Sequence, residues 1–145
     1  KVMDCCSIDS TGVDSITKQR IESYKFEKLR TPSLLLNNKL KNALPMNRFR
    51  PNLVFSGGHA HIEDEMEKFS INDINFLGVK PCSRCVMTTI NQQNAEKGKE
   101  PLKTLSTYRM KDNKIYFGQN VLHHQNGIIN VGDTIDITQQ GMPLF

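Results

Sequence analysis

Short apolar segments separated by turn-forming residue pairs fill the chain from residue 51 to its end. Each segment is only a few residues long, which is typical of a buried strand rather than of a core helix. The pairs Asn72-Asp73, Asn126-Gly127 and Gly132-Asp133 favour tight turns between strands. The predicted strands are 53–55, 69–71, 74–79, 86–90, 115–117, 121–122, 128–131 and 134–138. Their regular spacing indicates a mainly β domain, either a compact β barrel or a sandwich.

Three other segments have apolar residues at helical spacing and predict two or three short helices, mostly near the N-terminus. They cover residues 11–29, 33–40 and 101–108. The last of these begins with Pro101, a residue type that is favoured at the first position of a helix. The polar stretch from residue 91 to residue 99 contains almost no apolar side chain and predicts an exposed loop.

The 145 residues suffice for one domain, because a chain of this length buries about two-thirds of the surface that its unfolded form exposes. Lys and Arg number 19 against 15 Asp and Glu, a net charge of +4 that mildly favours anionic partners. The basic residues are not clustered among aromatic ones, so nucleic acid is not an expected partner. No membrane span is expected either, since the longest apolar runs, 34–36 and 53–55, fall far short of the ~20 residues required.

The four cysteines fall into two tight pairs, Cys5-Cys6 and Cys82-Ser83-Arg84-Cys85. Pairs this close make a poor disulfide framework, because useful disulfides join distant segments of a small secreted fold. The sequence therefore predicts a reducing compartment and a cytoplasmic protein. Nearby positive charge on Lys80 and Arg84 favours the thiolate form of cysteine, which binds soft metals and acts as a nucleophile.

Several interpretations of the Cys-x-x-Cys motif stay open. A zinc knuckle needs a second pair of ligands, and neither the adjacent cysteines nor the histidines have the usual spacing. A thioredoxin-like dithiol needs a helix after the motif, whereas residues 86–90 predict a strand. Both thiols could also be buried as small hydrophobic groups. The acidic stretch 63–67 could hold a metal ion, but a run of charges is more often a solvated loop.

Arg48-Phe49-Arg50-Pro51-Asn52 is a second candidate for binding chemistry. Arg48 and Arg50 are two residues apart, so in an extended chain their side chains point to the same side. Pro51 favours that extended conformation at the residue before it. Planar guanidinium groups match a phosphate or the fused-ring amides of a pterin. A solvated basic edge is the simpler interpretation of the spacing alone.

Taken together and in order, these motifs resemble a MOSC domain, the C-terminal domain of molybdenum cofactor sulfurases and of the amidoxime-reducing component family. The amidoxime-reducing branch is the more similar of the two. The resemblance extends over roughly residues 33–137. The motifs that carry it are Arg48–Asn52, Ser56-Gly57, Glu63-Asp64, Val79–Cys85, Thr88-Thr89, Glu96–Leu102, Thr104-Leu105, Tyr108-Arg109, Phe117–Asn120 and Gly127–Asp133.

The resemblance implies a β-barrel-like MOSC fold that carries a molybdenum cofactor, a molybdenum pyranopterin. In the family the second cysteine of Cys-x-x-Cys is the metal ligand, which makes Cys85 the candidate metal ligand and catalytic residue. The family's Arg-Pro-Asn motif implies that Arg50 and Asn52 line the cofactor. The other candidate cofactor-binding residues are the two that precede the ligand and the first arginine of the basic motif: Ser83, Arg84 and Arg48.

The resemblance also implies the reaction and its partners. We expect an oxidoreductase that reduces small N-hydroxylated compounds by oxygen-atom transfer. Two electrons per cycle would come from a separate electron-donor protein of the ferredoxin-like, flavin or haem type. One alternative is a sulfur carrier that holds a persulfide on Cys85 for the sulfuration of a metal cofactor. Another is a non-catalytic binding module.

The domain organisation that follows from the resemblance has three parts. Residues 33–138 form the MOSC domain. Residues 1–32 are an N-terminal extension or the remnant of a preceding domain. Residues 139–145 are a short tail.

Overall fold

The computed structural model describes residues 2–5, 34–56 and 59–145. The predicted helix over 11–29 lies outside these residues. The helices and strands in chain order are β1 (Val2–Cys5), α1 (Leu34–Lys39), η1 (Met46–Phe49), η2 (Ile62–Glu65), β2 (Met66–Ile71), β3 (Ile74–Arg84), η3 (Val86–Thr89), α2 (Leu102–Leu105), β4 (Met110–Lys111), β5 (Lys114–His123) and β6 (Ile135–Gln140), where η marks a 3-10 helix.

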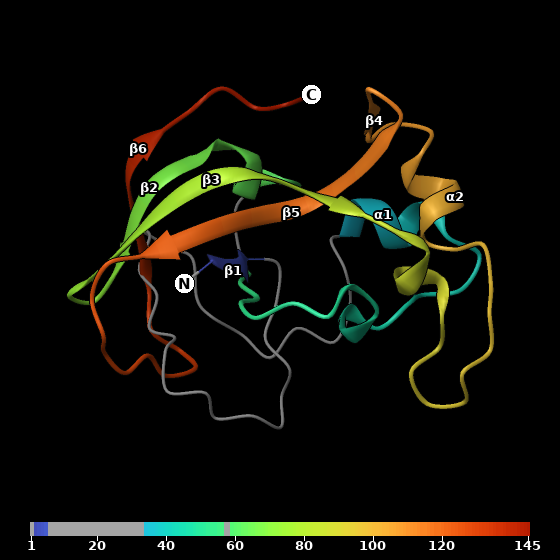
Figure 1. The fold of residues 1–145 in the computed structure, drawn as a ribbon, viewed down its shortest axis with the longest axis horizontal. Helices are drawn as coiled ribbons and strands as arrows, with labels where there is room; N and C mark the ends of the chain where they lie inside the picture. Colours follow the sequence, from blue (N-terminus) through green and yellow to red (C-terminus); the bar gives the residue numbers. More distant parts are fainter. Residues whose placement is uncertain (1, 6–33, 57–58) are drawn as a thin grey trace.

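The six strands found in the described residues belong to one antiparallel sheet with the order β1-β5-β3-β2-β6, and β4 pairs with β5 beside this path (Figure 1). The prediction of a mainly β domain with few short helices is confirmed. Among the described residues the strand path is open, with β1 and β6 at its ends, and does not close into a barrel. The predicted helices at 33–40 and 101–108 are present in shortened form as α1 and α2.

The hairpin of β2 and β3 forms where the sequence predicts it. Ile71 pairs with Ile74, and the turn between them contains Asn72 in a left-handed conformation with φ 49°. Asparagine tolerates this conformation better than most residues, which is why an Asn-Asp pair suits the turn. β5 is one continuous strand, although residues 115–117 and 121–122 suggested two.

The pairing of β3 with β5 contains two irregularities. The register shifts by one residue between Gly78 and Lys80, and it shifts again between Pro81 and Ser83. Gly78 pairs with Val121 before the shifts, and Ser83 pairs with Tyr116 after them, so the second shift restores the original register. Bulges of this kind re-aim side chains and increase the local twist of the sheet.

The predicted strand over 86–90 is wrong. Residues 86–89 form the 3-10 helix η3, with Val86 and Met87 exposed and Thr88 and Thr89 buried, and Ile90 makes only an isolated β-bridge with Lys97. The Thr88 hydroxyl donates to the Cys85 carbonyl at 3.0 Å, and the Thr89 hydroxyl donates to the Val86 carbonyl at 2.7 Å. Such local bonds compete with a strand ladder, which explains why β-branched residues fold as a turn here.

The predicted strands over 53–55 and 128–131 are also wrong. Leu53 and Val54 are buried in the core, but the segment joins no strand of the sheet. In 128–131 only Ile129 is buried, while Ile128 and Val131 are more than 60% exposed. A short apolar run indicates burial, and the structure shows that burial alone does not place a segment in a sheet.

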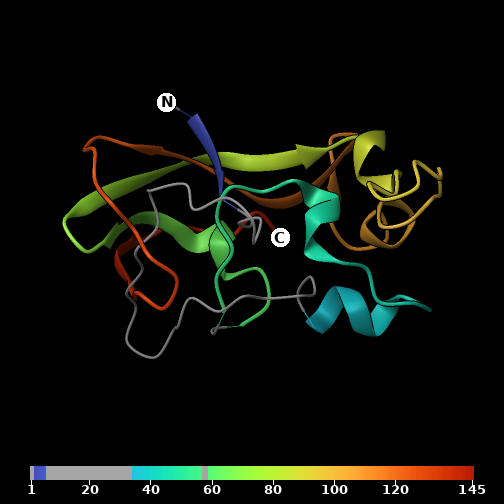
Figure 2. The same cartoon turned by 90° about the horizontal axis from the view of Figure 1, so that it is seen from below.

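Two hydrophobic clusters lie along the length of the β3 and β5 pair. The first cluster surrounds the hairpin and consists of Leu53, Met66, Phe69, Ile71, Ile74, Phe76, Val121, Ile129 and Ile135. The second cluster consists of Leu36, Phe49, Leu105 and Phe117, which come from α1, η1, α2 and β5. Figure 2 shows η1 and α1 on the same side of the β3 and β5 pair. The second cluster therefore anchors the segments that carry the sequence motifs.

Gly78 gives a direct test of the packing around β3. A Cβ atom at this position would overlap the carbonyl oxygen of Met66, which is backbone and cannot turn aside. We expect Gly78→Ala to lower the free energy of unfolding by about 1–3 kcal/mol. Gly98→Ala is the matched control, because its Cβ would meet nothing closer than the Thr89 carbonyl oxygen at 3.6 Å.

The measurement is urea unfolding of both variants beside the wild-type chain. Gly98→Ala should stay within about 0.5 kcal/mol of wild type. Equal stability of the two variants would show that β2 and β3 do not approach one another this closely.

Candidate functional site

Cys85 lies between the end of β3 and the start of η3, and its side chain is exposed. Its backbone is extended, with φ −113° and ψ −178°, and its carbonyl accepts a hydrogen bond from the Thr88 amide at 3.2 Å. The thiol is free. The chain thus presents this sulfur to solvent at a turn that backbone and side-chain hydrogen bonds hold in shape.

Cys82 has a different environment from Cys85. It has intermediate exposure and packs against the second hydrophobic cluster. Among the described residues no group of three or more His, Cys, Asp or Glu side chains could hold a metal ion, so the structure gives the zinc-knuckle interpretation no support. The two thiols of the motif therefore differ in environment: Cys82 packs against the second cluster, whereas Cys85 is exposed to solvent.

The basic motif folds as a turn rather than as the predicted extended chain. Met46–Phe49 form η1, and Arg50 follows in the left-handed conformation with φ 49° and ψ 51°. The Arg50 amide donates to the Asn47 carbonyl at 3.0 Å and closes the turn. Phe49 anchors this turn because its buried ring stacks on Phe117 with the ring centroids 4.1 Å apart. Packing of Phe49 therefore prevails over the preference of a pre-proline residue for extended backbone.

Beyond this turn, Arg50 and Asn52 have exposed side chains. Arg48 is half-buried, and its Nε atom is shielded from solvent. Within the described parts of the chain this Nε finds no hydrogen-bond acceptor. A buried donor without an acceptor is costly, so the Arg48 Nε atom is a place where an added acceptor would be favourable.

Arg84 connects the basic turn to the thiol. Its Nε donates to the Phe117 carbonyl at 2.8 Å, and its Nη1 donates to the Phe49 carbonyl at 2.9 Å. The η1 and η3 helices are in contact, and the Gln92 side chain donates to the Asn47 carbonyl at 2.5 Å. The structure thus brings the backbone of the Arg48–Asn52 motif next to that of the Ser83–Cys85 motif.

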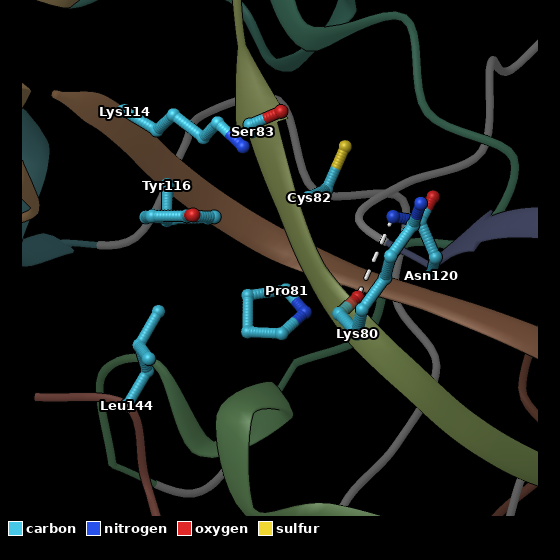
Figure 3. Close-up of a pocket in the computed structure, with 8 residues that line it drawn as sticks. All are labelled: Lys80, Pro81, Cys82, Ser83, Lys114, Tyr116, Asn120 and Leu144. Atoms are coloured by element: carbon cyan, nitrogen blue, oxygen red, sulfur yellow. Dashed lines mark hydrogen bonds between the residues drawn. The ribbon is translucent and has the colours of Figure 1, made fainter. Parts of the chain in front are cut away.

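A groove of about 400 Å³ lies on the exposed side of β3, beside the C-terminal segment (Figure 3). Its lining residues are Lys80, Pro81, Cys82, Ser83, Lys114, Tyr116, Asn120 and Leu144. Of the predicted site residues only Ser83 lines it, so the groove is not the space between Cys85 and the arginines. Lys114 and Tyr116 carried no signal in the sequence, because the long-range pairing of β5 with β3 places them here.

The acidic stretch is not the solvated loop that its composition favoured. Asp64 is buried and forms an ion pair with the buried Arg109, with Nη2 of Arg109 2.7 Å from Oδ2 and 2.9 Å from Oδ1. Arg109 Nε also donates to the Tyr116 carbonyl at 3.3 Å. Burial raises the pKa of the Asp64 carboxyl, and the neighbouring Arg109 charge opposes that rise. This pair ties η2 to the strand that carries Phe117.

Half-buried polar residues next to that pair have shifted pKa values as well. Burial raises the pKa of Tyr108 to about 12. Burial also pushes the pKa of Glu63 up, but the neighbouring His61, with Nδ1 3.7 Å from Oε1 of Glu63, brings it below its usual value. The His61 ring meets the Phe117 ring edge to face, with the centroids 5.8 Å apart. These groups lie around the second cluster, so we assign them to the packing beneath the Cys85 and Arg48–Asn52 motifs and not to the candidate site itself.

The open antiparallel sheet, the exposed thiol after β3 and the adjoining basic turn define the class of the domain. The chain belongs to the MOSC domain family, whose model matches residues 18–136. The match begins well before residue 33, and the boundaries at 33 and 138 stay predictions. No helix in the described residues is long and apolar enough to cross a membrane.

The chain is similar in sequence to an amidoxime-reducing component and to a molybdenum cofactor sulfurase. The chain is 36% identical to mitochondrial amidoxime-reducing component 1 of Homo sapiens over 114 residues, which are 72% of this chain and 34% of that protein. It is 38% identical to the molybdenum cofactor sulfurase of Oryza sativa subsp. japonica over 112 residues, which are 71% of this chain and 14% of that protein. The chain thus spans about a third of the length of the first relative and about a seventh of the second.

Proposed function

We propose that this chain is a molybdenum-cofactor-binding MOSC domain of an oxidoreductase that reduces N-hydroxylated compounds by oxygen-atom transfer. One observation carries the proposal: an exposed thiol, Cys85, lies at a turn that Arg84 joins to the basic turn of Arg48 and Arg50. Similarity to an amidoxime-reducing component and to a molybdenum cofactor sulfurase supports the same assignment.

The residues present fit a molybdenum pyranopterin. Cys85 offers a soft sulfur donor of the kind that such a metal prefers. Arg50 and Asn52 have exposed side chains in the basic motif, and the unpartnered Nε of Arg48 would gain an acceptor from an anionic, oxygen-rich group. Ser83 would add a hydroxyl from the exposed face of β3. When bound, the cofactor would supply a two-electron redox centre able to accept an oxygen atom, and the chain's share would be binding and orientation.

Each turnover of this reaction needs two electrons and two protons. We assign the electrons to a separate donor protein of the ferredoxin-like, flavin or haem type, and the oxidising substrate to a small N-oxygenated molecule. Arg50 would hold the anionic part of the cofactor in place, and Cys85 would fix the metal at the open end of the turn. A cytoplasmic location stays a prediction that rests on the arrangement of the cysteines.

The proposal is tested on the full chain, purified from cells that make the cofactor. Molybdenum is measured by elemental mass spectrometry, pterin by fluorescence after oxidation, and activity by the reduction of benzamidoxime with a chemically reduced viologen. We expect molybdenum and pterin in equal amounts together with amidoxime reduction. Retained activity after complete loss of the metal would contradict the proposal, and so would a chain that binds neither molybdenum nor pterin.

The exposure of Cys85 also favours a second candidate function, a sulfur carrier. A persulfide on this thiol would be accessible to another protein, and a carrier needs a reactive thiolate rather than an enclosed cofactor pocket. Similarity to a molybdenum cofactor sulfurase is consistent with this role. Intact-protein mass spectrometry separates the two candidates: a reducible gain of one sulfur atom on Cys85, in protein without pterin, would favour the carrier.

A further inference from the structure

We propose that Arg84 acts as a positioning residue, which sets the place of Cys85 relative to Arg50 through its hydrogen bonds to backbone carbonyls. The effect on catalysis rests on the proposed function, whereas the structural role does not. In sequence Arg84 directly precedes the candidate metal ligand, and the family resemblance implies that it lines the cofactor. The structure directs its side chain toward backbone carbonyls instead.

Two hydrogen bonds define this role. Nε of Arg84 reaches the carbonyl of Phe117, 33 residues away in sequence, and Nη1 reaches the carbonyl of Phe49, 35 residues away. The same guanidinium lies 5.7 Å from the centroid of the Phe49 ring. The Phe49 and Phe117 rings stack on one another, so the arginine ties together the backbones of two residues whose side chains are already in contact.

The two hydrogen bonds of Arg84 are here called the Arg84 clamp, and two of its residues, Phe49 and Arg84, are direct chain neighbours of candidate site residues. Phe49 directly precedes Arg50, and Arg84 directly precedes Cys85. The hydrogen bond from Arg84 to the Phe49 carbonyl therefore holds Arg50 and Cys85 in a fixed relative position, because each of them is the next residue in the chain after one partner of the bond. The bond to the Phe117 carbonyl holds the arrangement against β5.

Only arginine suits this position among the basic residues. Its guanidinium is planar and presents several N–H donors in a fixed fork, so it can bond two carbonyls at once. A lysine would keep the positive charge, but its single ammonium on a flexible stem cannot hold the same geometry. Arg84→Lys consequently separates charge from positioning, and it is the more informative variant.

The test compares Arg84→Lys and Arg84→Ala with Lys68→Ala, a control that removes an exposed positive charge on β2. Hydrogen–deuterium exchange of the 46–52 peptide reports the clamp without any cofactor. We expect exchange there to be about tenfold faster in both Arg84 variants, the effect of losing a backbone-anchoring hydrogen bond. The control and the peptide that covers β2 should be unchanged. If Arg84→Ala fails to fold, Arg84→Lys decides the outcome.

In the cofactor-loaded protein we expect kcat to fall about 10- to 100-fold in Arg84→Lys, with KM within about threefold, as for residues that orient a metal ligand. Guanidinium ion added to Arg84→Ala should restore part of the activity. Unchanged exchange with reduced cofactor content would overturn the proposal, because Arg84 would then contact the cofactor directly. Faster exchange with unchanged kcat would overturn its role in positioning the site. The exchange result stands even if the proposed reaction is wrong.

Discussion

Cys85→Ala is expected to lose molybdenum and amidoxime reduction down to background, whereas Cys82→Ala should keep both. The physical reason is the difference in setting between the two thiols. Cys85 is exposed at the turn after β3, where its sulfur can bind a soft metal. Cys82 packs against the second hydrophobic cluster, so its removal costs packing and leaves the candidate ligand in place.

The two cysteine variants are matched, since each removes one thiol from the same four-residue motif. Elemental analysis gives the metal content, and unfolding in urea shows whether either variant has lost its fold. Cys82→Ala should be destabilised by about 1 kcal/mol and stay active. Metal retained by a folded Cys85→Ala chain, or lost only in Cys82→Ala, would remove Cys85 from the site.

Asp64→Asn is expected to lower the free energy of unfolding by about 3–5 kcal/mol, the usual effect of removing one partner of a buried ion pair. Asp64 and Arg109 are buried within 2.7 Å of each other, with side-chain exposures of 2% and 3%. The substitution leaves the Arg109 guanidinium charged in a place that water does not reach. Because Arg109 also bonds the Tyr116 carbonyl, next to Phe117, the damage should extend to the second cluster.

Glu65→Gln is the control for that experiment. It breaks the ion pair with His59, whose side chain is 59% exposed, and should change stability by no more than about 0.5 kcal/mol. The double variant Asp64→Leu with Arg109→Met removes both buried charges and should recover most of the lost stability. Chemical unfolding measures all four proteins. A loss below about 1 kcal/mol in Asp64→Asn would mean that the pair is not buried.

The parts of the fold that local sequence patterns determine could be predicted. Alternating apolar residues and the Asn72-Asp73 pair predict the β2 and β3 hairpin because both signals act within a few residues. The η3 helix could not be predicted from strand propensity, since Thr88 and Thr89 satisfy nearby carbonyls through their hydroxyl groups. Leu53 and Val54 are a second example: their apolar side chains correctly indicate burial, but they do not indicate whether the segment pairs with a strand of the sheet.

The membership of the candidate site stays a prediction from the family resemblance, whereas the geometry of its motifs comes from the structure. Resemblance to the family names Cys85, Arg50 and Asn52, and the structure brings their motifs together. The left-handed Arg50 and the inward course of Arg84 depend on the stacking of Phe49 with Phe117, a contact between residues 68 apart in sequence that no local pattern contains. The roles of these residues toward a cofactor stay predictions.

The two compensating register shifts in the β3 and β5 pair restrict how the length of this region can change. Because the second shift undoes the first, irregular backbone is confined to a window of residues 79–82 on β3 and 117–120 on β5, and the pairs at Ser83 and Arg84 keep the same frame as those at Phe76 and Leu77. Removing one residue from this window would turn the following side chains to the opposite face of the sheet. An insertion or deletion of one residue in this window must therefore be compensated by a second one, so that the residues leading to Cys85 stay on the same faces of the sheet.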